Sequence, residues 1–442
     1  MERFFKLSES GTNVKTEFRA GLTTFMTMAY ILAVNPFILS QTGMDAGAVF
    51  TATVLASIVG TLAMALYANL PFALAPGMGL NAIFAYTICL SMGIPWQTAL
   101  AAVLVEGIIF MVLGFLNVRE AIINAIPLAI KNAISVGIGL FIAFIGVLNA
   151  GIAVSGKEIT PDGTLAGLTV QVGDLTQPGV ILALIGVLIT SVLIVRGVRG
   201  AILIGIVVTT LIGIPMGVVS FEGAKIFNTP PSLAPIALQF EFSKLFSPEM
   251  LMALFTLLFV DMFDTVGTLI GVSARANMLN EKGEVPRAKQ ALMADAIATT
   301  VGAMMGTSTV TTYVESASGV AEGGRTGLAS VFTAIFFAIS LFFSGLFLLV
   351  PAQATAPALI IVGMYMCASV VKIDWNDLHQ AIPAFLTFAL MPFTYSIAEG
   401  ITFGVLFFVF ISILSGKTKE LRVSTYVLTL FLIAKVAFLF FQ

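Results

Sequence analysis

The sequence predicts an all-α polytopic membrane protein, and three of its features lead to this fold class. Of the 442 residues, 58% are hydrophobic and only 10% are charged, whereas a soluble domain carries about 25% charged residues. Apolar runs long enough to cross a bilayer recur along the chain, and their order is the same in both halves. So few charges cannot cover a water-facing exterior, and most of the surface is therefore expected to face hydrocarbon.

Full-length spans are expected where roughly 20 apolar residues follow one another, because a helix satisfies its own backbone hydrogen bonds inside the bilayer. The predicted spans cover residues 21–40, 48–69, 96–116, 132–150, 178–195 and 201–219, then 250–272, 291–306, 328–350, 382–397, 401–414 and 425–440. Two further apolar pieces, 118–130 and 357–371, are expected to lie along the membrane surface or to pack within the fold.

Two segments fit neither a plain helix nor a loop. Residues 70–90 begin with Pro71 and Pro76 and become helical only later, and residues 307–327 open with the β-favouring run TSTVTTY. Each predicts a short extended stretch that leads into a half-helix. Non-helical backbone at membrane depth needs protein or a water-filled cavity around it, and paired interruptions in two halves of a transporter mark its binding site.

The order of elements predicts an inverted repeat. Each half contains two long helices, an interrupted segment, a long helix, an amphipathic connector and three more helices. This gives fourteen transmembrane spans as two repeats of seven, with the interrupted segments as spans 3 and 10. Because seven is odd, the second repeat is inverted relative to the first.

The distribution of Lys and Arg favours a cytoplasmic N-terminus, because cytoplasmic loops are rich in these residues. Most of them fall on segments that this orientation places inside. Lys372 falls outside, however, and Lys417, Lys419 and Arg422 cluster in a loop that is also placed outside. Residues 1–19 contain no apolar stretch, so no cleaved signal peptide is expected. A net charge of −2 with scattered basic residues gives no indication of nucleic-acid binding.

Asp261 and Asp264 are candidates for a functional role, because burying an ionisable group in a membrane costs at least a few kcal/mol. They lie three residues apart in the span 250–272 and so share roughly one helix face. Two neighbouring carboxyl groups resist ionising together, and at least one is expected to hold a proton that could couple proton entry to transport. A structural carboxyl that braces a neighbouring helix is the alternative for each.

Glu315 and Asn81 stand at the two helix breaks. A half-helix N-terminus exposes free N–H groups and a positive dipole end. Glu315 either satisfies those N–H groups or accepts hydrogen bonds from a ligand. Asn81 can donate and accept at once, and its alternative role is a turn or helix cap.

Other polar residues are expected to be structural. Glu106, Asp295, Glu322 and Glu399 are interpreted as interhelical or interfacial groups, and His379 is the single histidine. A His-rich metal site is therefore excluded. The chain also has no phosphate-binding loop and no serine-hydrolase elbow, so no cofactor and no enzymatic activity are expected.

The sequence resembles the AzgA-like purine permeases of the nucleobase–ascorbate transporter superfamily. Five stretches carry the resemblance: TEFRAGLTTF at 16–25, APGMGLNA at 75–82, FDTVGTL at 263–269, YVESASG at 313–319 and EGGRTG at 322–327. The resemblance implies import of adenine, guanine or hypoxanthine, usually by proton symport, with sodium as the less favoured coupling ion. A transporter of the same fold for an anion or for uracil or xanthine is the alternative, and an intramembrane enzyme is a more distant one.

The resemblance also implies an architecture and a site. A core domain would comprise residues 1–117 and 221–350, and a gate domain, which often forms a homodimer, residues 118–220 and 351–442. The core would slide against the gate as an elevator in the cell membrane, with both termini in the cytoplasm. The substrate-binding positions carry over onto Asn81, Asp264 and Glu315, with Thr24 and Ser316 as neighbours. Asp264, Glu315 and Asp261 are the candidates for proton coupling.

Overall fold

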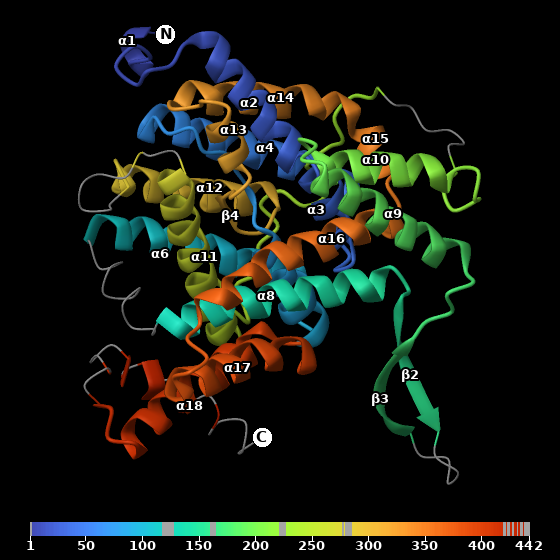
Figure 1. Ribbon diagram of the computed structural model, residues 1–442, viewed down its shortest axis with the longest axis vertical. Coiled ribbons are helices and arrows are strands. Elements are labelled where there is room, and N and C mark those ends of the chain that lie inside the picture. The colour runs from blue at the N-terminus through green and yellow to red at the C-terminus, as the bar shows by residue number, and fades with distance from the viewer. Residues whose placement is uncertain are drawn as a thin grey trace.

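The computed structural model describes residues 2–116, 128–159, 165–220, 227–275, 278, 285–418, 421, 425, 426, 428–430, 432, 433 and 436. Helices make up most of its regular structure (Figure 1). The first half contains α1 (Glu2–Phe5), α2 (Val14–Met28), α3 (Ile31–Ser40), α4 (Ala46–Ala63), the π-helix η1 (Met64–Ala68), α5 (Met78–Ala82), the π-helix η2 (Ile83–Ser91), α6 (Trp96–Leu116), α8 (Leu128–Asn149), α9 (Pro178–Val195) and α10 (Ala201–Gly213). The second half contains α11 (Pro248–Arg275), α12 (Ala288–Met305), α13 (Ser316–Ala321), α14 (Gly327–Ser340), the 3-10 helix η3 (Leu341–Phe343), α15 (Ser344–Leu348), α16 (Ala352–Cys367), the 3-10 helix η4 (Ala368–Lys372), α17 (Leu378–Phe393) and α18 (Ile397–Leu414).

The polytopic membrane prediction is confirmed by the length and composition of these helices. Among the described residues, nine helices are long and apolar enough to cross a membrane, and three shorter apolar helices accompany them. Polar caps mark some helix starts. Asn13 accepts a hydrogen bond from the Thr16 N–H at 3.0 Å before α2, and Asp45 accepts one from the Ala48 N–H at 2.7 Å before α4. Such caps satisfy N–H groups that have no partner within the helix.

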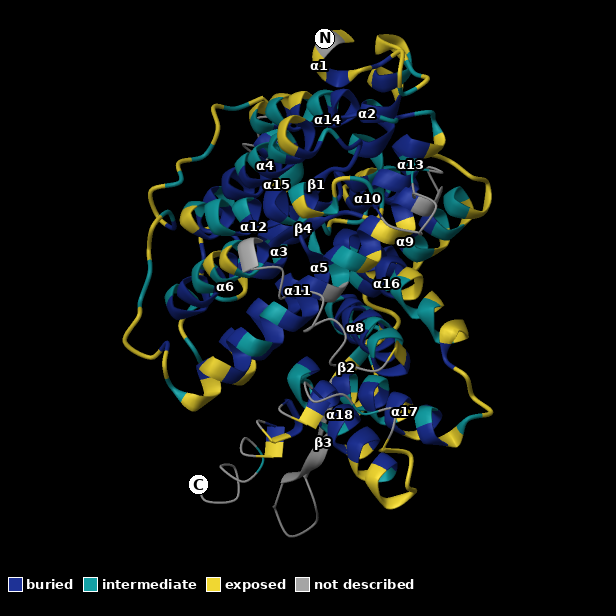
Figure 2. Cartoon of the chain, turned by 90° about the vertical axis from the view of Figure 1, so that its left-hand side faces the viewer, coloured by how far each residue is buried: buried dark blue, intermediate teal, exposed yellow. Residues whose placement is uncertain are grey.

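The two interrupted segments meet, as the sequence predicts. β1 (Leu74–Pro76) pairs antiparallel with β4 (Val310–Thr312), so that Leu74 lies opposite Thr312 and Pro76 opposite Val310. Every residue of both strands is buried, and Figure 2 shows them in the dark-blue interior of the molecule. The two strands satisfy each other's backbone groups, which is how extended chain is accommodated away from water.

The helices pack into two groups. The β1–β4 group contains the helices that surround the strands, namely α2, α3, α4, α5, α6, α11, α12, α13 and α14. The α8 group contains α8, α9, α10, α16, α17 and α18, which contact mainly one another. Figure 1 shows α8, α16 and α17 below α2, α4, α12 and α14. The groups touch where α5 and α11 contact α8, and where α10 contacts α2.

Several details differ from the sequence-based expectation. The predicted span 21–40 is two helices, α2 and α3, interrupted at Ala29 and Tyr30. The apolar piece 357–371 forms the end of α16 and most of η4 and packs against α8, which is one of the two predicted placements. A hairpin of β2 (Ala153–Ile159) and β3 (Leu165–Val172), which was not predicted, follows α8 and projects from the helices (Figure 1).

Two predicted segments cannot be compared in full. The piece 118–130 lies outside the described residues except for its last three positions, which belong to α8. The predicted span 425–440 is described only at scattered positions, all of them helical.

Candidate functional site

The N-terminal ends of two half-helices face the crossing of β1 and β4. The Gly77 N–H donates to the Thr309 carbonyl at 3.0 Å, and the Tyr313 N–H donates to the Ala73 carbonyl at 2.9 Å. The Tyr313 hydroxyl donates to the Pro76 carbonyl at 2.6 Å. These bonds fix the start of α5 and the approach to α13 in one rigid unit. The N-terminal ends of both half-helices, where the helix dipoles are positive, therefore start from the same pair of strands.

Glu315 immediately precedes α13 and is half-buried. Its carboxylate oxygen Oε1 accepts a hydrogen bond from the Tyr30 hydroxyl at 2.8 Å. Its side chain does not cap α13. Because a carboxylate has two oxygens and about four lone-pair positions, Glu315 retains acceptor capacity for a ligand.

Asp264 lies in α11 and is also half-buried. Its carboxylate is close enough to Glu315 for the two charges to interact. It accepts no hydrogen bond from the described residues, so its oxygens are available to a ligand. α11, which carries Asp264, contacts both α5 and α13.

Asn81 lies in α5 and is fully buried. Its carbonyl oxygen accepts a hydrogen bond from the Ser308 hydroxyl, whereas its NH₂ group has no hydrogen-bond partner among the described residues. Leaving a buried donor unpaired costs about 1–3 kcal/mol. The half-helix of the first repeat therefore offers a free donor, and that of the second offers a carboxylate acceptor.

Ser316 and Thr24 lie beside these residues in supporting positions. The Ser316 hydroxyl oxygen accepts the Ala73 N–H at 3.0 Å, which ties α13 to the chain before β1. Thr24 lies in α2 against Gly319, so closely that a side chain at Gly319 would collide with it. Both residues are buried.

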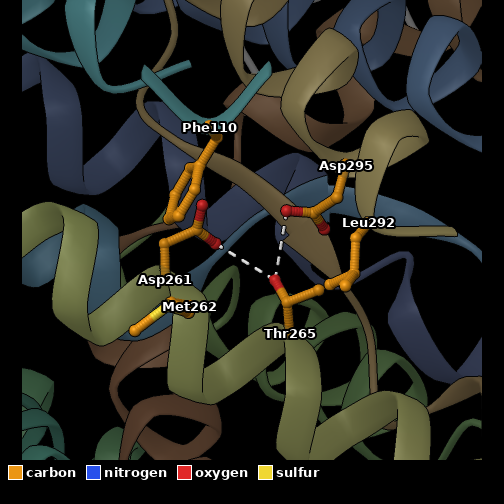
Figure 3. A pocket seen from close by; sticks show the side chains of 6 residues that line it. All are labelled: Phe110, Asp261, Met262, Thr265, Leu292 and Asp295. Carbon is orange, nitrogen blue, oxygen red and sulfur yellow. Dashed lines mark hydrogen bonds between the residues drawn. The ribbon is translucent and has the colours of Figure 1, made fainter. Parts of the chain in front are cut away.

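Asp261 has different hydrogen-bond partners from Asp264, although both are in α11. Its Oδ1 accepts a hydrogen bond from the Thr265 hydroxyl at 3.3 Å, and Thr265 also lies 3.1 Å from Asp295 Oδ2. Figure 3 shows the Asp261 and Asp295 carboxyl groups directed toward each other above Thr265. Although they are three residues apart, the two aspartates therefore have different neighbours: Asp264 lies near Glu315, and Asp261 lies near Asp295 of α12.

Sequence reasoning missed two residues of the site. Tyr30 stands in an apolar run with no adjacent Gly or Pro to mark the helix break between α2 and α3. Ser308 belongs to the run TSTVTTY, which was interpreted only as extended backbone. The one available signal for Ser308 was its position directly before a predicted strand at membrane depth, because a buried hydroxyl needs a hydrogen-bond partner.

The comparisons with known proteins agree with this fold. A family model described as the permease family matches residues 15–403. The adenine permease AdeP of Escherichia coli is 42% identical over 99% of this chain and 96% of its own length. The guanine/hypoxanthine permease PbuG of Bacillus subtilis is 44% identical over the full length of both chains. The transmembrane domain of the cyanobacterial bicarbonate transporter BicA superposes with a TM-score of 0.65 at 16% identity, covering 88% of this chain and 97% of that one. The structural likeness shows the fold alone, and the family match with the two relatives shows that this chain belongs to the permease family.

Proposed function

We propose that the protein imports purine nucleobases, namely adenine, guanine or hypoxanthine, by proton symport. The single observation that carries the proposal is the pairing of a free buried donor, the Asn81 NH₂ group, with two acceptors, Asp264 and Glu315, beside one strand crossing. A purine base is flat and neutral, and it presents N–H donors and ring-nitrogen or carbonyl acceptors around its edge. Relatives at 42% and 44% identity are named as permeases for such bases.

Each polar group of the proposed site has its own role. Glu315 accepts a hydrogen bond from a ring N–H or amino group of the base, and Asp264 accepts a second one or holds a proton. Asn81 donates to a carbonyl or ring nitrogen. Thr24 and Ser316 hold α2 and the chain before β1 against α13. Selectivity among purines then depends on matching donors to acceptors along one edge, since unpaired polar groups in a site penalise the wrong base.

An anion exchanger of the same fold is the second candidate, because the superposed BicA domain carries bicarbonate. The carboxylates of Asp264 and Glu315 argue against an anion substrate, because anion sites use the positive ends of helix dipoles and negative charges there would offset them. Uracil and xanthine remain alternatives that a competition assay separates.

We propose that transport follows an elevator mechanism, with residues 1–117 and 221–350 as the core and 118–220 and 351–442 as the gate. The packing of the β1–β4 group and the α8 group supports this division, because each group makes most of its contacts internally. The core carries the whole site. The gate is the proposed surface for a homodimer.

We further propose that the fourteenth crossing ends at Leu414, with both termini in the cytoplasm of a cell membrane. Counting Ala352–Lys372 as a crossing supports this topology, because its length and hydropathy suffice. Lys372 and Lys417 then lie on the cytoplasmic side, which removes the conflict with the positive-inside rule. Lys417 pairs with Asp377 at 3.4 Å, so the ends of α17 and α18 lie on the same side. Lys419 and Arg422, outside the described residues, follow Lys417 in sequence.

Uptake of radiolabelled adenine, guanine and hypoxanthine by cells, with and without a protonophore, tests the function. Glu315→Gln and Asp264→Ala should nearly abolish uptake while the protein remains inserted, and the exposed Asp174→Asn serves as a matched control. Normal uptake by either site variant would place the site elsewhere. Uptake that persists without a proton gradient but needs sodium would overturn proton coupling.

The topology is tested by single cysteines in a background in which Cys89 and Cys367 are replaced by alanine. Lys372→Cys should react with a membrane-impermeant maleimide only from the cytoplasmic side, and Asp174→Cys only from outside. Labelling of both from the same side would contradict the proposed count.

A further inference from the structure

An acidic residue ends the half-helix of the second repeat, at the opposite end from Glu315. Glu322 is the C-cap of α13, and its N–H donates to the Gly319 carbonyl at 3.0 Å. Its side chain is only 9% exposed. The C-terminal end of a helix carries a partial negative charge, so a carboxylate there is unfavourable unless cations compensate it. Glu322 therefore needs positive partners.

Two arginines from different helix groups supply the positive charge. Arg19 lies in α2, in the β1–β4 group, and its Nη2 atom lies 3.4 Å from Glu322 Oε2. Arg199 lies in the turn between α9 and α10, in the α8 group, and its Nη2 atom forms an ion pair with Glu322 Oε1. The side chains of Arg19 and Arg199 are 60% and 61% exposed. Each oxygen of the nearly buried carboxylate thus has its own, largely solvated, guanidinium group.

The end of α13 is fixed within the β1–β4 group. Gly323 has a φ of +99°, a left-handed conformation that turns the chain after the helix. Arg325 Nη1 donates to the carbonyl oxygens of Val320 and Gly324, both at 2.8 Å. The Arg325 N–H donates to Glu17 Oε1 of α2 at 2.9 Å. The end of α13 and α2 therefore form one unit, to which both Glu322 and Arg19 belong.

The turn that carries Arg199 packs closely on α2. A Cβ atom added at Gly200 would lie 3.0 Å from the Met26 carbonyl oxygen and 3.3 Å from Met26 Cβ. Gly200 also has a φ of +69°, which favours glycine. This is one of the places where the two helix groups touch, since α10 contacts α2. The Arg199–Glu322 ion pair therefore crosses the boundary between the proposed core and the proposed gate.

The three charges are arranged so that the boundary can open without leaving a buried charge unpaired. An uncompensated charge in a nearly buried position is costly. If the turn between α9 and α10 moves away from α2, Glu322 keeps Arg19, and the exposed Arg199 side chain passes into water. An ion pair with a solvated partner contributes little to stability, so it can be broken in every transport cycle.

We propose that Glu322 is a releasable latch between the core and the gate, with Arg199 as the partner that leaves and Arg19 as the partner that stays. The inference rests on the core and gate of the proposed function. In the proposed topology the latch lies on the cytoplasmic side, because α2 begins there. While Arg199 is paired, the cytoplasmic ends of the core and the gate stay together. Its release lets the two separate on this side.

The rate at which a single cysteine reacts from the cytoplasmic side tests the latch. The reporter is Met26→Cys in the background without Cys89 and Cys367, because Met26 lies against the turn at Gly200. A membrane-impermeant maleimide then measures how often the turn moves away, and the assay needs no purine.

The two arginines should have opposite effects on this rate. Arg199→Gln should label about fivefold faster than the reporter alone, which corresponds to about 1 kcal/mol for the ion pair. Arg19→Gln should label more slowly than the reporter, because release of Arg199 would then leave Glu322 unpaired. The exposed Lys15 of α2 and Arg196 at the end of α9 provide matched controls. Lys15→Gln and Arg196→Gln should label at the rate of the reporter.

Glu322→Gln keeps the test decisive if Arg19→Gln does not insert. It should label as fast as Arg199→Gln. The double variant of Glu322→Gln with Arg199→Gln should label no faster than either single variant, because both substitutions remove the same ion pair.

Three outcomes would overturn the inference. Equal labelling of Arg199→Gln and the reporter would show that the ion pair does not hold the boundary closed. Faster labelling of both arginine variants would show that the three charges only brace the fold. Additive effects in the double variant would show that Arg199 acts through another partner. Uptake of labelled purine is measured in parallel: no uptake by wild type would refute the proposed function, whereas the labelling rates would still decide the latch.

Discussion

Replacing Tyr30 with phenylalanine should weaken purine binding without displacing any backbone. The Tyr30 hydroxyl is the donor that holds Glu315 Oε1, at 2.8 Å, and the tyrosine ring is 1% exposed. A hydrogen bond to a charged group contributes about 1.5–3 kcal/mol. Without it the carboxylate is free to rotate, and part of the binding energy of the base must be used to reorient it. A loss of about 1.5 kcal/mol corresponds to a dissociation constant raised about tenfold.

The assay is equilibrium binding of labelled adenine, guanine and hypoxanthine to purified Tyr30→Phe protein, with the melting temperature measured in parallel. Tyr67→Phe is the control, because Tyr67 is 58% exposed. The three purines should lose affinity by a similar factor, since Tyr30 orients Glu315 and does not read the base. Unchanged affinity for every purine would refute the assignment of Glu315 as the anchor.

Three further perturbations test other parts of the structure. Glu17→Gln should lower the free energy of unfolding by about 3 kcal/mol. Glu17 accepts hydrogen bonds from the N–H groups of Arg325 and Ala329 at the start of α14, and a hydrogen bond to a charged group contributes about 1.5–3 kcal/mol. Thermal melting of this variant is compared with that of Glu9→Gln, and equal melting temperatures would contradict the role of Glu17. Gly319→Ala should reduce purine binding and lower the free energy of unfolding by about 1–3 kcal/mol, because the new methyl group collides with Ala20 and Thr24. The separate single variant Thr24→Ser should keep purine binding and a melting temperature close to those of wild type. Arg199→Glu should slow uptake, because the new carboxylate repels Glu322, which also contacts Arg19. The free energy of unfolding should change by less than about 1 kcal/mol. The double variant Arg199→Glu with Glu322→Arg should recover part of the uptake rate, and no recovery would show that the pair does not act through its charges.

The strand crossing could be predicted because proline, glycine and β-favouring residues interrupt two otherwise apolar runs. Pro71 and Pro76 deny the helix its hydrogen bonds, and the threonine-rich run before Tyr313 favours extended backbone. Once both segments are extended inside a membrane, pairing with each other satisfies their backbone groups. Asn81 and Glu315 became candidates for the site for the same reason, because they stand at these breaks.

The surroundings of each carboxyl group could not be predicted from spacing. Asp261 and Asp264 share a helix face, and one common role was the simplest interpretation. In the structure, α11 contacts α12 and α6 as well as α5 and α13. A rotation of less than a turn is therefore enough to give the two aspartates different neighbours. Glu106 and Asp295 were interpreted as structural, and in the structure they accept hydrogen bonds from Thr309 and Thr312, respectively.

The C-terminal third was the weakest part of the sequence-based description. Pro351 and Pro357 shortened the apparent apolar run of 357–371, although Pro357 lies inside α16. Tertiary packing against α8 sustains the helix there. The hairpin of β2 and β3 was missed because its short alternating segments were treated as a loop between two strong helical signals. Alternation of polar and β-branched residues over 153–172 was the available indication.

The two halves of the chain contribute opposite chemistry to one crossing. The first half supplies the free Asn81 NH₂ donor and the Tyr30 hydroxyl, which already donates its proton to Glu315. The second half supplies acceptors, Asp264 and Glu315. In the proposed site, a flat base between the half-helices would have the Asn81 donor on one side and the Asp264 and Glu315 acceptors on the other, and this asymmetry would fix its orientation. Under the predicted inverted repeat, the two half-helices would be related by symmetry, and the different side chains at the two breaks would give the site its direction.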